Sequence, residues 1–214
     1  TRCKVVGRLG VGLDNIDTAG CAARGLTVIP ATGANALSVA EYVIACSLLL
    51  LRGAYGATAQ VTSGTWPRTA LSSGREVGGK TLGLIGFGSI GQLTARLAQG
   101  VGMQVIGFDA MLAADHPVYA QTGVRAVGLA ELTASADVIS LHVPLVDATR
   151  GLFDAARIGA MKKGAVLINS ARGGVVDEAA VAAALRSGHL GGAALDVFET
   201  EPVPAGGVFD GCPN

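Results

Sequence analysis

Two short segments combine glycines with chemically useful neighbours, and each follows an apolar run. The first is GFGSIG, residues 86–91, which comes directly after TLGLI. In such a loop Gly86 makes the tight turn, Gly88 lets the backbone approach a pyrophosphate, and Gly91 allows a helix to pack on a strand. The helix that opens near Ile90 directs free N–H groups and its positive dipole end toward phosphates. The segment therefore predicts a dinucleotide site.

The carboxylate of Asp109 is the second part of this predicted site. It closes the next apolar run, MQVIGFD, about 20 residues beyond the glycine loop, where such a carboxylate meets a ribose. It can accept hydrogen bonds from both ribose hydroxyls and would repel a 2′-phosphate, which favours NAD over NADP. The alternative is an ordinary turn residue after a strand.

The second segment is VLINSARGGVVDE, in which Arg172 ends an apolar run and is followed by Gly173 and Gly174. A guanidinium at this edge of a sheet offers a planar fork to a carboxylate and a fixed charge to a carbonyl oxygen. The two glycines leave room for close approach, and Asp177 is expected to cap the next helix. The alternative is a surface arginine, but a helix N-terminus is a poor place for a cation.

Acid–base chemistry has fewer candidates. Asp196 ends the run AALDV and is placed to accept a hydrogen bond from a nicotinamide carboxamide, and Glu201 could orient an imidazole and raise its pKa. Of the histidines, His142 is expected to line the adenine side of a cleft or cap a strand, and His116 to be solvated in a loop. His189 precedes a strand, so it is expected at the opposite end of the sheet.

The elements that position these residues alternate along the chain. From Lys80 onward, apolar runs are separated by helical segments, which predicts an α/β fold: a Rossmann-type doubly wound parallel sheet covered on both faces. Ligands of such sheets bind beyond the carboxyl ends of the strands. The apolar helix expected from Asn35 to Leu51 is shorter than the roughly 20 residues of a membrane span. We expect it to be buried on most sides, in the core or in a subunit interface.

The composition excludes several classes of partner. The 214 residues include 16 Lys plus Arg and 16 Asp plus Glu, so the chain has no basic field for nucleic acid or a membrane surface. The cysteines are far apart in the sequence, with no CxxC pair, which favours reduced thiols in a cytoplasmic protein and no structural metal. They are Cys3, Cys21, Cys46 and Cys212.

The order of these blocks resembles one family, the NAD-dependent D-2-hydroxyacid dehydrogenases, which include D-3-phosphoglycerate dehydrogenase. The matching blocks are GRLGVGLDNID, NALSVAEY, GKTLGLIGFGSIG, GFDA, LHVPL, NSARGGVVDE and AALDVFETEP. The resemblance implies hydride transfer between NAD and a 2-hydroxy acid, a small-molecule substrate. The residue roles that it implies are backbone amides of Val11 and Gly12 for the substrate carboxylate, Ser89 and Ile90 for the pyrophosphate, Asp109 for the ribose, Val143 for the adenine pocket, Ser170 and Ala171 for the nicotinamide, Asp196 for its carboxamide, Arg172 for the substrate, and Glu201 as partner of the catalytic histidine.

The resemblance also implies a domain organisation. Residues 1–30 correspond to the C-terminal part of the first segment of a flavodoxin-like substrate domain, and residues 31–214 to the NAD-binding domain. The block with the catalytic histidine is expected beyond Asn214, so we expect a chain truncated at both ends that is inactive by itself. Relatives commonly dimerise through this part of the cofactor domain, so we expect a homodimer through the helix from Asn35 to Leu51.

Two other functions fit the same fold, which alone does not decide function. They are an NAD(H)-sensing assembly module of the corepressor type and an NAD-dependent formate dehydrogenase. The sequence does not name the acid substrate. Arg8, in GRLG, either supplies a charge for an anionic substituent on carbon 3 or is a solvated loop residue.

Overall fold

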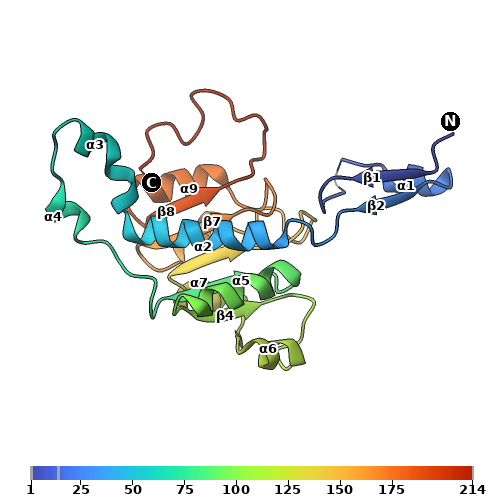
Figure 1. The fold of residues 1–214 in the computed structure, drawn as a ribbon, viewed down its shortest axis with the longest axis horizontal. Helices are drawn as coiled ribbons and strands as arrows, with labels where there is room; N and C mark the ends of the chain where they lie inside the picture. The colour runs from blue at the N-terminus through green and yellow to red at the C-terminus, as the bar shows by residue number, and fades with distance from the viewer. Residues whose placement is uncertain (1, 14, 214) are drawn as a thin grey trace.

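A six-stranded sheet forms the body of the protein in a computed structural model that describes residues 2–13 and 15–213 (Figure 1). Every neighbouring pair in the order β5-β4-β3-β6-β7-β8 is parallel. From β3 the chain first adds β4 and β5 on one side and then β6, β7 and β8 on the other, so the strand order reverses between β3 and β6, as in a doubly wound sheet. The predicted Rossmann-type sheet is confirmed. Its strands are β3 (Thr81–Ile85), β4 (Gln104–Phe108), β5 (Arg125–Ala126), β6 (Val138–Leu141), β7 (Ala165–Asn169) and β8 (Leu190–Leu195).

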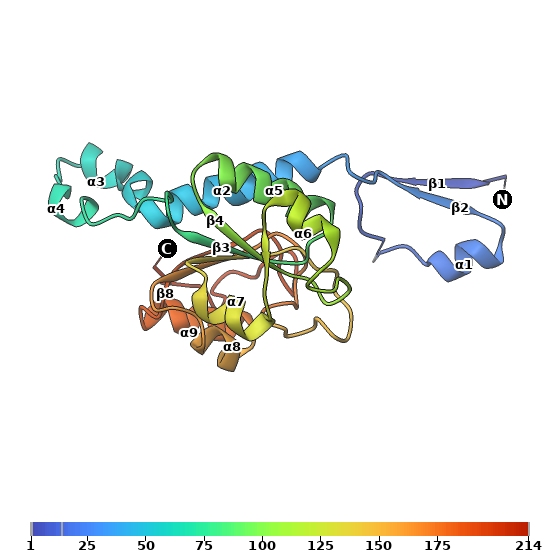
Figure 2. The ribbon, with the colours of Figure 1, turned by 90° about the horizontal axis from the view of Figure 1, so that it is seen from below.

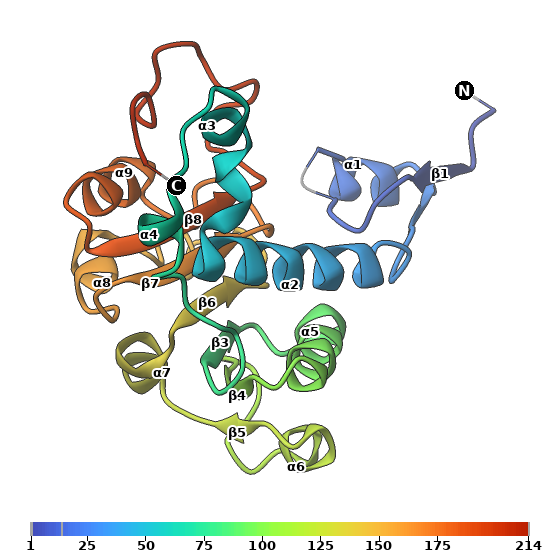
Figure 3. The same ribbon diagram turned by 60° about the vertical axis from the view of Figure 1, so that its left-hand side comes forward.

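Helices cover both faces of this sheet (Figure 3). One face carries α2 (Ala36–Arg52), α5 (Ser89–Gly100) and α6 (Pro117–Thr122). The opposite face carries α7 (Leu129–Ser135), α8 (Ala155–Gly159) and α9 (Glu178–Arg186).

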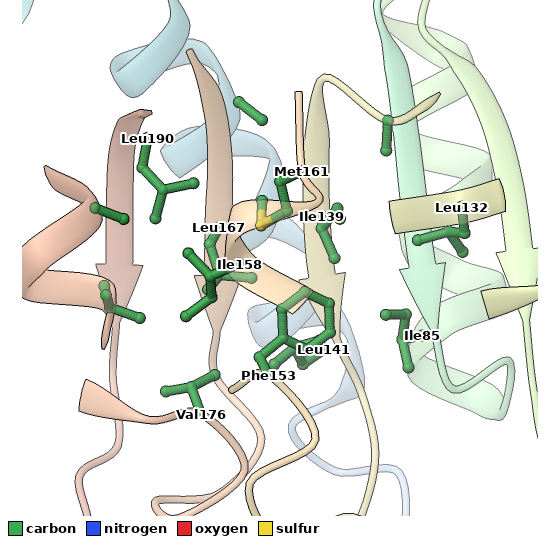
Figure 4. Close-up of a cluster of buried hydrophobic side chains, with 14 of the residues drawn as sticks. Ile85, Leu132, Ile139, Leu141, Phe153, Ile158, Met161, Leu167, Val176 and Leu190 are labelled. Carbon is green, nitrogen blue, oxygen red and sulfur yellow. The ribbon is translucent and has the colours of Figure 1, made fainter. Parts of the chain in front are cut away.

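The central strands contribute side chains to two separate cores, one on each face of the sheet. Ile139, Leu141 and Leu167 belong to the core beneath α7, α8 and α9, where Phe153 and Ile158 are also fully buried (Figure 4). Val138, Val166 and Ile168 point the other way and pack with α2 and α5. A strand buried on both faces has to be apolar at consecutive positions, which explains the continuous apolar runs of the sequence.

The first two strands form a separate small unit. β1 (Val5–Arg8) pairs in parallel with β2 (Thr27–Pro30) in a two-stranded sheet, joined by α1 (Thr18–Ala23). Asp17 caps α1 by accepting a hydrogen bond from the Gly20 amide at 2.8 Å. Figures 1 and 2 show the unit standing away from the large sheet, with α2 leading from one to the other. That it belongs to a flavodoxin-like domain stays a prediction.

Within the single chain, the helix α2 is buried on one face, and burial of its other face in a subunit interface stays a prediction. Val43, Ile44 and Leu51 are buried against the large domain, but Leu37 and Leu49 are 52% and 48% exposed. No helix of the part of the chain that the structure describes is long and apolar enough to cross a membrane.

Short helices fill the segment between α2 and β3. The polar stretch before β3 contains η1 (Ala54–Ala57), α3 (Thr58–Thr62) and α4 (Arg68–Leu71), and together they project from the body of the protein (Figure 1). His116 was expected to be merely solvated, but its Nδ1 accepts a hydrogen bond from the Val118 amide and caps α6. Pro117 at the first helical position favours that start.

Candidate active site

The glycine loop connects β3 to α5, and its three glycines meet different surroundings. Gly86 has φ +93°, and a Cβ there would overlap the carbonyl oxygen of His142. A Cβ on Gly91 would overlap the carbonyl oxygen of Gly86. Gly88 differs, because a Cβ there would have no atom within 4 Å. Two of the glycines thus permit close packing within the protein, and the third borders open space.

The amino end of α5 faces this open space with unpaired donors. Its cap residue Gly88 provides no side-chain hydrogen bond, and the amides of Ser89 and Ile90 donate to no acceptor among the described residues. Free amides and the helix dipole make this a favourable position for anionic groups. The pyrophosphate role of this loop stays a prediction, and the glycine cap places no side chain in the open space.

Asp109 holds this loop against the end of β4. One oxygen of its carboxylate accepts a hydrogen bond from the Phe87 amide at 2.7 Å, and the other accepts one from the Met111 amide at 2.8 Å. Each carboxylate oxygen has a second lone pair, so the group can still accept hydrogen bonds from ribose hydroxyls. The position fits an NAD ribose, and the carboxylate also organises the loop.

A tight turn follows β7 and is held by Asn169, which the sequence analysis did not consider. The side chain of Asn169 is fully buried; its Nδ2 donates to the carbonyl oxygen of Arg172 at 2.9 Å, and its Oδ1 accepts from the Ala171 amide at 3.1 Å. The guanidinium of Arg172 donates to the Ala171 carbonyl oxygen at 2.6 Å. In the sequence, the asparagine at the end of an otherwise apolar strand was the feature that could have indicated a side chain holding this turn.

Ser170, in the same turn, has a buried hydroxyl oxygen with no hydrogen-bond partner among the described residues. Buried hydroxyls are normally paired, so this oxygen is available to a bound molecule. Gly173 was expected to leave room for close approach of a ligand, but the structure gives another reason for a glycine at this position. A Cβ there would overlap the backbone of Phe198, so this glycine admits the loop after β8 and not a ligand.

The turn after β7 and the amino end of α5 border one cleft of about 560 Å³. Loop residues 10–12 of the small unit also line this cleft. The amides of Val11 and Gly12 donate to no acceptor in the described part of the chain. The cleft therefore brings together residues far apart in the sequence. Its lining is Arg8, Gly10, Val11, Gly12, Asn15, Asn35, Val39, Ile90, His142, Val143, Pro144, Ser170, Ala171 and Arg172.

Two predicted residues lie outside this lining. Asp196 follows β8 and is exposed; its amide donates to the Asn169 carbonyl oxygen at 3.0 Å, which places it beside the turn that carries Arg172. Glu201 is exposed, and its Oε1 accepts a hydrogen bond from the Phe198 amide at 2.9 Å. The loop of Glu201 reaches the turn after β7 through the contact of Phe198 with Gly173.

The histidine at the cleft, His142, is not suited to be a proton acceptor at neutral pH. Its Nε2 lies 3.0 Å from the Ser140 hydroxyl, and burial lowers the pKa of His142 to about 4. A ring with that pKa is neutral at pH 7 and is a weak base. His189 lies before β8, where its Nε2 contacts the Ile158 carbonyl oxygen at 3.0 Å, at the end of the sheet opposite the cleft.

The parallel sheet, the glycine loop and the carboxylate after β4 define a dinucleotide-binding domain of the Rossmann type. The family profile described as D-isomer specific 2-hydroxyacid dehydrogenase, NAD binding domain, matches residues 44–214. The chain belongs to this family. The predicted family and the predicted cofactor, NAD, are thereby confirmed, and the roles of single residues stay predictions.

Relatives of known name are similar over most of the chain. It is 54% identical over 208 residues to the (S)-sulfolactate dehydrogenase of Chromohalobacter salexigens, covering 97% of this chain and 67% of that protein. It is 45% identical over 202 residues to the D-3-phosphoglycerate dehydrogenase of Bacillus subtilis, covering 94% of this chain and 38% of the other.

A solved structure is similar as well. The D-lactate dehydrogenase of Aquifex aeolicus, complexed with NAD and lactic acid, superposes with a TM-score of 0.83 and 35% sequence identity. The match covers 94% of this chain and 60% of that one. The chain thus spans less than two thirds of the length of several relatives.

Proposed function

We propose that the protein transfers a hydride between NAD and a 2-hydroxy acid. The observation that carries this proposal is the cleft in which the amides of Val11 and Gly12, the guanidinium of Arg172 and the amino end of α5 meet. Donors for a carboxylate, a fixed positive charge for the neighbouring oxygen, and a cofactor loop in one cleft match the needs of this reaction. In the oxidation direction, C2 of the acid loses a hydride and its hydroxyl loses a proton.

The acid lies between the two units of the chain in this proposal. Its carboxylate accepts hydrogen bonds from the amides of Val11 and Gly12 and pairs with Arg172. Arg172 also stabilises the negative charge that grows on the C2 oxygen during reduction of the oxo acid. Asn169 keeps the Arg172 backbone in place through the bonds at 2.9 Å and 3.1 Å, so it is a positioning residue.

The cofactor side of the cleft uses the residues that follow β3, β4, β6 and β7. The NAD supplies the hydride acceptor or donor when it is bound. Gly88 and the amides of Ser89 and Ile90 hold its pyrophosphate, and Asp109 holds the adenosine ribose. The remaining contacts are Val143 at the adenine, Ser170 and Ala171 at the nicotinamide, and Asp196 at the carboxamide.

Proton transfer is not assigned to the histidines of this chain. His142 is neutral and bonded to Ser140, His116 caps α6, and His189 lies at the far end of the sheet. Glu201 is proposed to orient a catalytic imidazole and favour its charged form, as a carboxylate partner does. The carboxylate is exposed and accepts, among residues 2–13 and 15–213, one hydrogen bond, from the Phe198 amide to Oε1, so within those residues its second oxygen is open to such a partner.

A steady-state assay tests this proposal. NADH formation is followed by absorbance with a set of 2-hydroxy acids and, separately, with formate. In the full-length protein that contains the catalytic imidazole, we expect turnover of at least one hydroxy acid, and we expect Arg172→Met to lower kcat/KM by about 100-fold or more, because one charged stabiliser is lost. Arg125→Met is the matched control, since Arg125 lies in β5 and pairs with Glu131 at the surface. Turnover of formate alone, or an Arg172→Met variant with normal kcat/KM, contradicts the proposal.

The protein is also proposed to form a homodimer through α2. The argument is the exposure of three leucines of α2, Leu37, Leu48 and Leu49, at 52%, 38% and 48%. A helix with apolar residues on both faces is more typical of an interface than of a solvated surface. We further propose a cytoplasmic location, in keeping with four unpaired cysteines.

A further inference from the structure

The segment that carries Glu201 lies directly against the turn that carries Arg172. A Cβ on Gly173 would overlap the carbonyl oxygen of Phe198 and would lie 2.7 Å from the amide nitrogen of Glu199. Backbone approaches backbone at this point, which a glycine permits because it has no side chain. A shift of either segment would therefore change the position of Glu201 relative to Arg172.

A carboxylate at the start of α9 adds a hydrogen bond to this contact. Glu178 is the first residue of α9 and is half-buried. Its Oε1 accepts a hydrogen bond from the Glu199 amide at 2.6 Å, although the two residues are 21 positions apart in the sequence. Hydrogen bonds to an ionised carboxylate are shorter and stronger than those between neutral groups. The bond thus joins the end of the Arg172 turn to the loop beyond β8.

The carboxylate of Glu201 is fixed to the same loop by the neighbouring amide. The Phe198 amide donates to Oε1 of Glu201 at 2.9 Å. Two consecutive amides, those of Phe198 and Glu199, therefore donate to two different carboxylates. The first bond holds Glu201 to its own loop, and the second holds that loop to α9. Together they connect Glu201 to the chain segment that presents Arg172.

The chain beyond this loop also returns to α9. Arg186, the last residue of α9, donates from Nη2 to the Val208 carbonyl oxygen at 2.6 Å. The ring of Phe209 lies edge-on to the ring of Phe198, with their centroids 6.2 Å apart. The loop is therefore anchored to both ends of α9, by Glu178 at the first residue and by Arg186 at the last.

An acidic residue in the first turn of a helix can also act on the helix alone, through the helix dipole. Glu131 has this position in α7, where it is 53% exposed and pairs with Arg125 at the surface. Glu178 differs, because it is half-buried and bonds to a distant loop. The start of α9 already has a cap in Asp177. The stability of α9 therefore does not account for the bond from Glu178 to the loop.

Resting on the proposed function, we propose that Glu178 is a positioning residue for proton transfer: its bond to the Glu199 amide holds Glu201 in place relative to Arg172. In this proposal Glu178 contacts neither substrate nor cofactor and acts through Glu201. A carboxylate beside an imidazole favours its charged form and raises its pKa. Displacement of Glu201 therefore lowers the pKa of the catalytic imidazole. The other charged residues of these segments, which stay unchanged in the variants below, are Arg172, Asp177, Asp196 and Glu199.

The variant Glu178→Ala, made in the full-length protein that contains the catalytic imidazole, removes the acceptor. Alanine is the best helix former, so the backbone of α9 tolerates it. We expect kcat for a 2-hydroxy acid to fall by about 10-fold and KM to change by less than about 3-fold, because substrate contacts remain. The pKa in the oxidation-direction pH profile should fall, as in Glu201→Gln. When residue 201 is already glutamine, Glu178→Ala should lower kcat by less than about 2-fold further, since both changes act through one group.

Two further variants separate the hydrogen bond from charge and from helix stability. Glu178→Gln keeps an Oε1 acceptor and loses the charge, so it should recover most of kcat and the wild-type pH profile. Glu131→Ala is the matched control, since it removes a first-turn glutamate from α7, and it should change neither quantity. Equal effects of Glu178→Gln and Glu178→Ala show that only the charge acts, which overturns the proposal. A lower kcat with an unmoved pH profile, or additive losses with Glu201→Gln, shows a structural role and also overturns it.

Measurements that need no turnover distinguish a failure of this proposal from a failure of the proposed function. In the wild type, the Glu199 amide should exchange its hydrogen at least about 10-fold more slowly than an unstructured amide; unprotected exchange overturns the proposal. If no acid is turned over, the proposed function fails, and NMR titration of the histidines in the NADH-bound protein decides on Glu178. A histidine whose pKa falls in Glu201→Gln and in Glu178→Ala, but not in Glu178→Gln, supports the proposal, and the lack of such a histidine overturns it. Glu178→Met, which keeps the length of the side chain, replaces Glu178→Ala if that variant does not fold.

Discussion

Replacing Gly88 with alanine is expected to weaken NAD binding and leave the fold intact, which separates the cofactor role of this glycine from a structural one. Gly88 has φ −73° and ψ −162°, values that alanine adopts without strain. A Cβ there meets no atom within 4 Å. Alanine is a poorer N-cap residue than glycine, by about 0.5–1 kcal/mol, but it stabilises the protein by a similar amount because it lowers the entropy of the unfolded chain. These effects offset, so the free energy of unfolding should change by less than about 0.5 kcal/mol.

The same methyl group would fill space that the pyrophosphate is proposed to use. We expect Gly88→Ala to raise the Kd for NADH by about 10-fold or more, or at least ~1.4 kcal/mol. Gly86→Ala is the contrasting variant. Gly86 has φ +93°, and the new Cβ would overlap the His142 carbonyl oxygen. Left-handed strain and the backbone clash together should cost about 3 kcal/mol or more of unfolding free energy.

Two measurements on each variant check these values: denaturant unfolding by circular dichroism, and titration of NADH by its fluorescence. Gly91→Ala serves as a second packing control, since its Cβ would overlap the carbonyl oxygen of Gly86. NADH binding by Gly88→Ala within twofold of the wild type would show that the open space beside this residue is not the pyrophosphate site. A Gly86→Ala variant as stable as the wild type would refute the assignment of Gly86 to a tight turn against β6.

Four further predictions concern single side chains. Asp109→Ala should weaken NADH binding and narrow the difference between NADH and NADPH, because a carboxylate at the ribose repels a 2′-phosphate; equal affinities in the wild type contradict this. Asn169→Leu should lower kcat/KM by about 10-fold or more, since the Arg172 turn loses bonds of 2.9 Å and 3.1 Å; Asn169→Asp, which keeps the acceptor, should keep more activity if the Ala171 bond matters. Leu49→Asp should convert a dimer to a monomer in sedimentation experiments, and a dimer that is indifferent to it argues against the α2 interface. Burial lowers the pKa of His142 to about 4, so the unfolded state takes up a proton at His142 before the folded state does as the pH falls below about 6.5. The free energy of unfolding should therefore drop by up to about 3 kcal/mol between pH 7 and pH 4. In His142→Gln, the drop in unfolding free energy over this pH range should be smaller by that amount.

Elements with a strong local pattern could be predicted from the sequence. The strands β3, β4, β6, β7 and β8 are short, largely apolar runs, and a parallel sheet buried on both faces needs such runs. The glycine loop and Asp109 are similarly local, because their positions after β3 and β4 follow from where those strands end. The cap at Asp177, which accepts a hydrogen bond from the Ala180 amide at 3.0 Å, was predicted for the same reason.

The short helices, and the contacts between loops that are distant in the sequence, could not be predicted from local sequence patterns. The six residues of α6 are too few for a periodic apolar pattern, and a helix of that length is held by its cap and by packing. The role of Gly173 depends on Phe198, which belongs to a loop beyond the next strand. Which face of α2 is exposed within the chain likewise depends on its neighbours, since apolar residues such as Leu37, Val43 and Leu49 occur on several sides of this helix.

The sequence by itself therefore determined the class of fold, the position of the glycine loop and the edge of the sheet at which the cleft lies. Backbone propensity and the alternation of buried and exposed positions act over a few residues, so local sequence patterns predict the helices and strands that they produce. Only the tertiary structure decided which polar groups meet. Arg8 and Arg172 border the same cleft although they belong to different units, and Asn169 holds the turn of Arg172 with an amide that looks like an ordinary strand end. Such contacts depend on how the small unit and the large sheet, which α2 connects, are placed relative to each other. A local sequence pattern does not predict that placement.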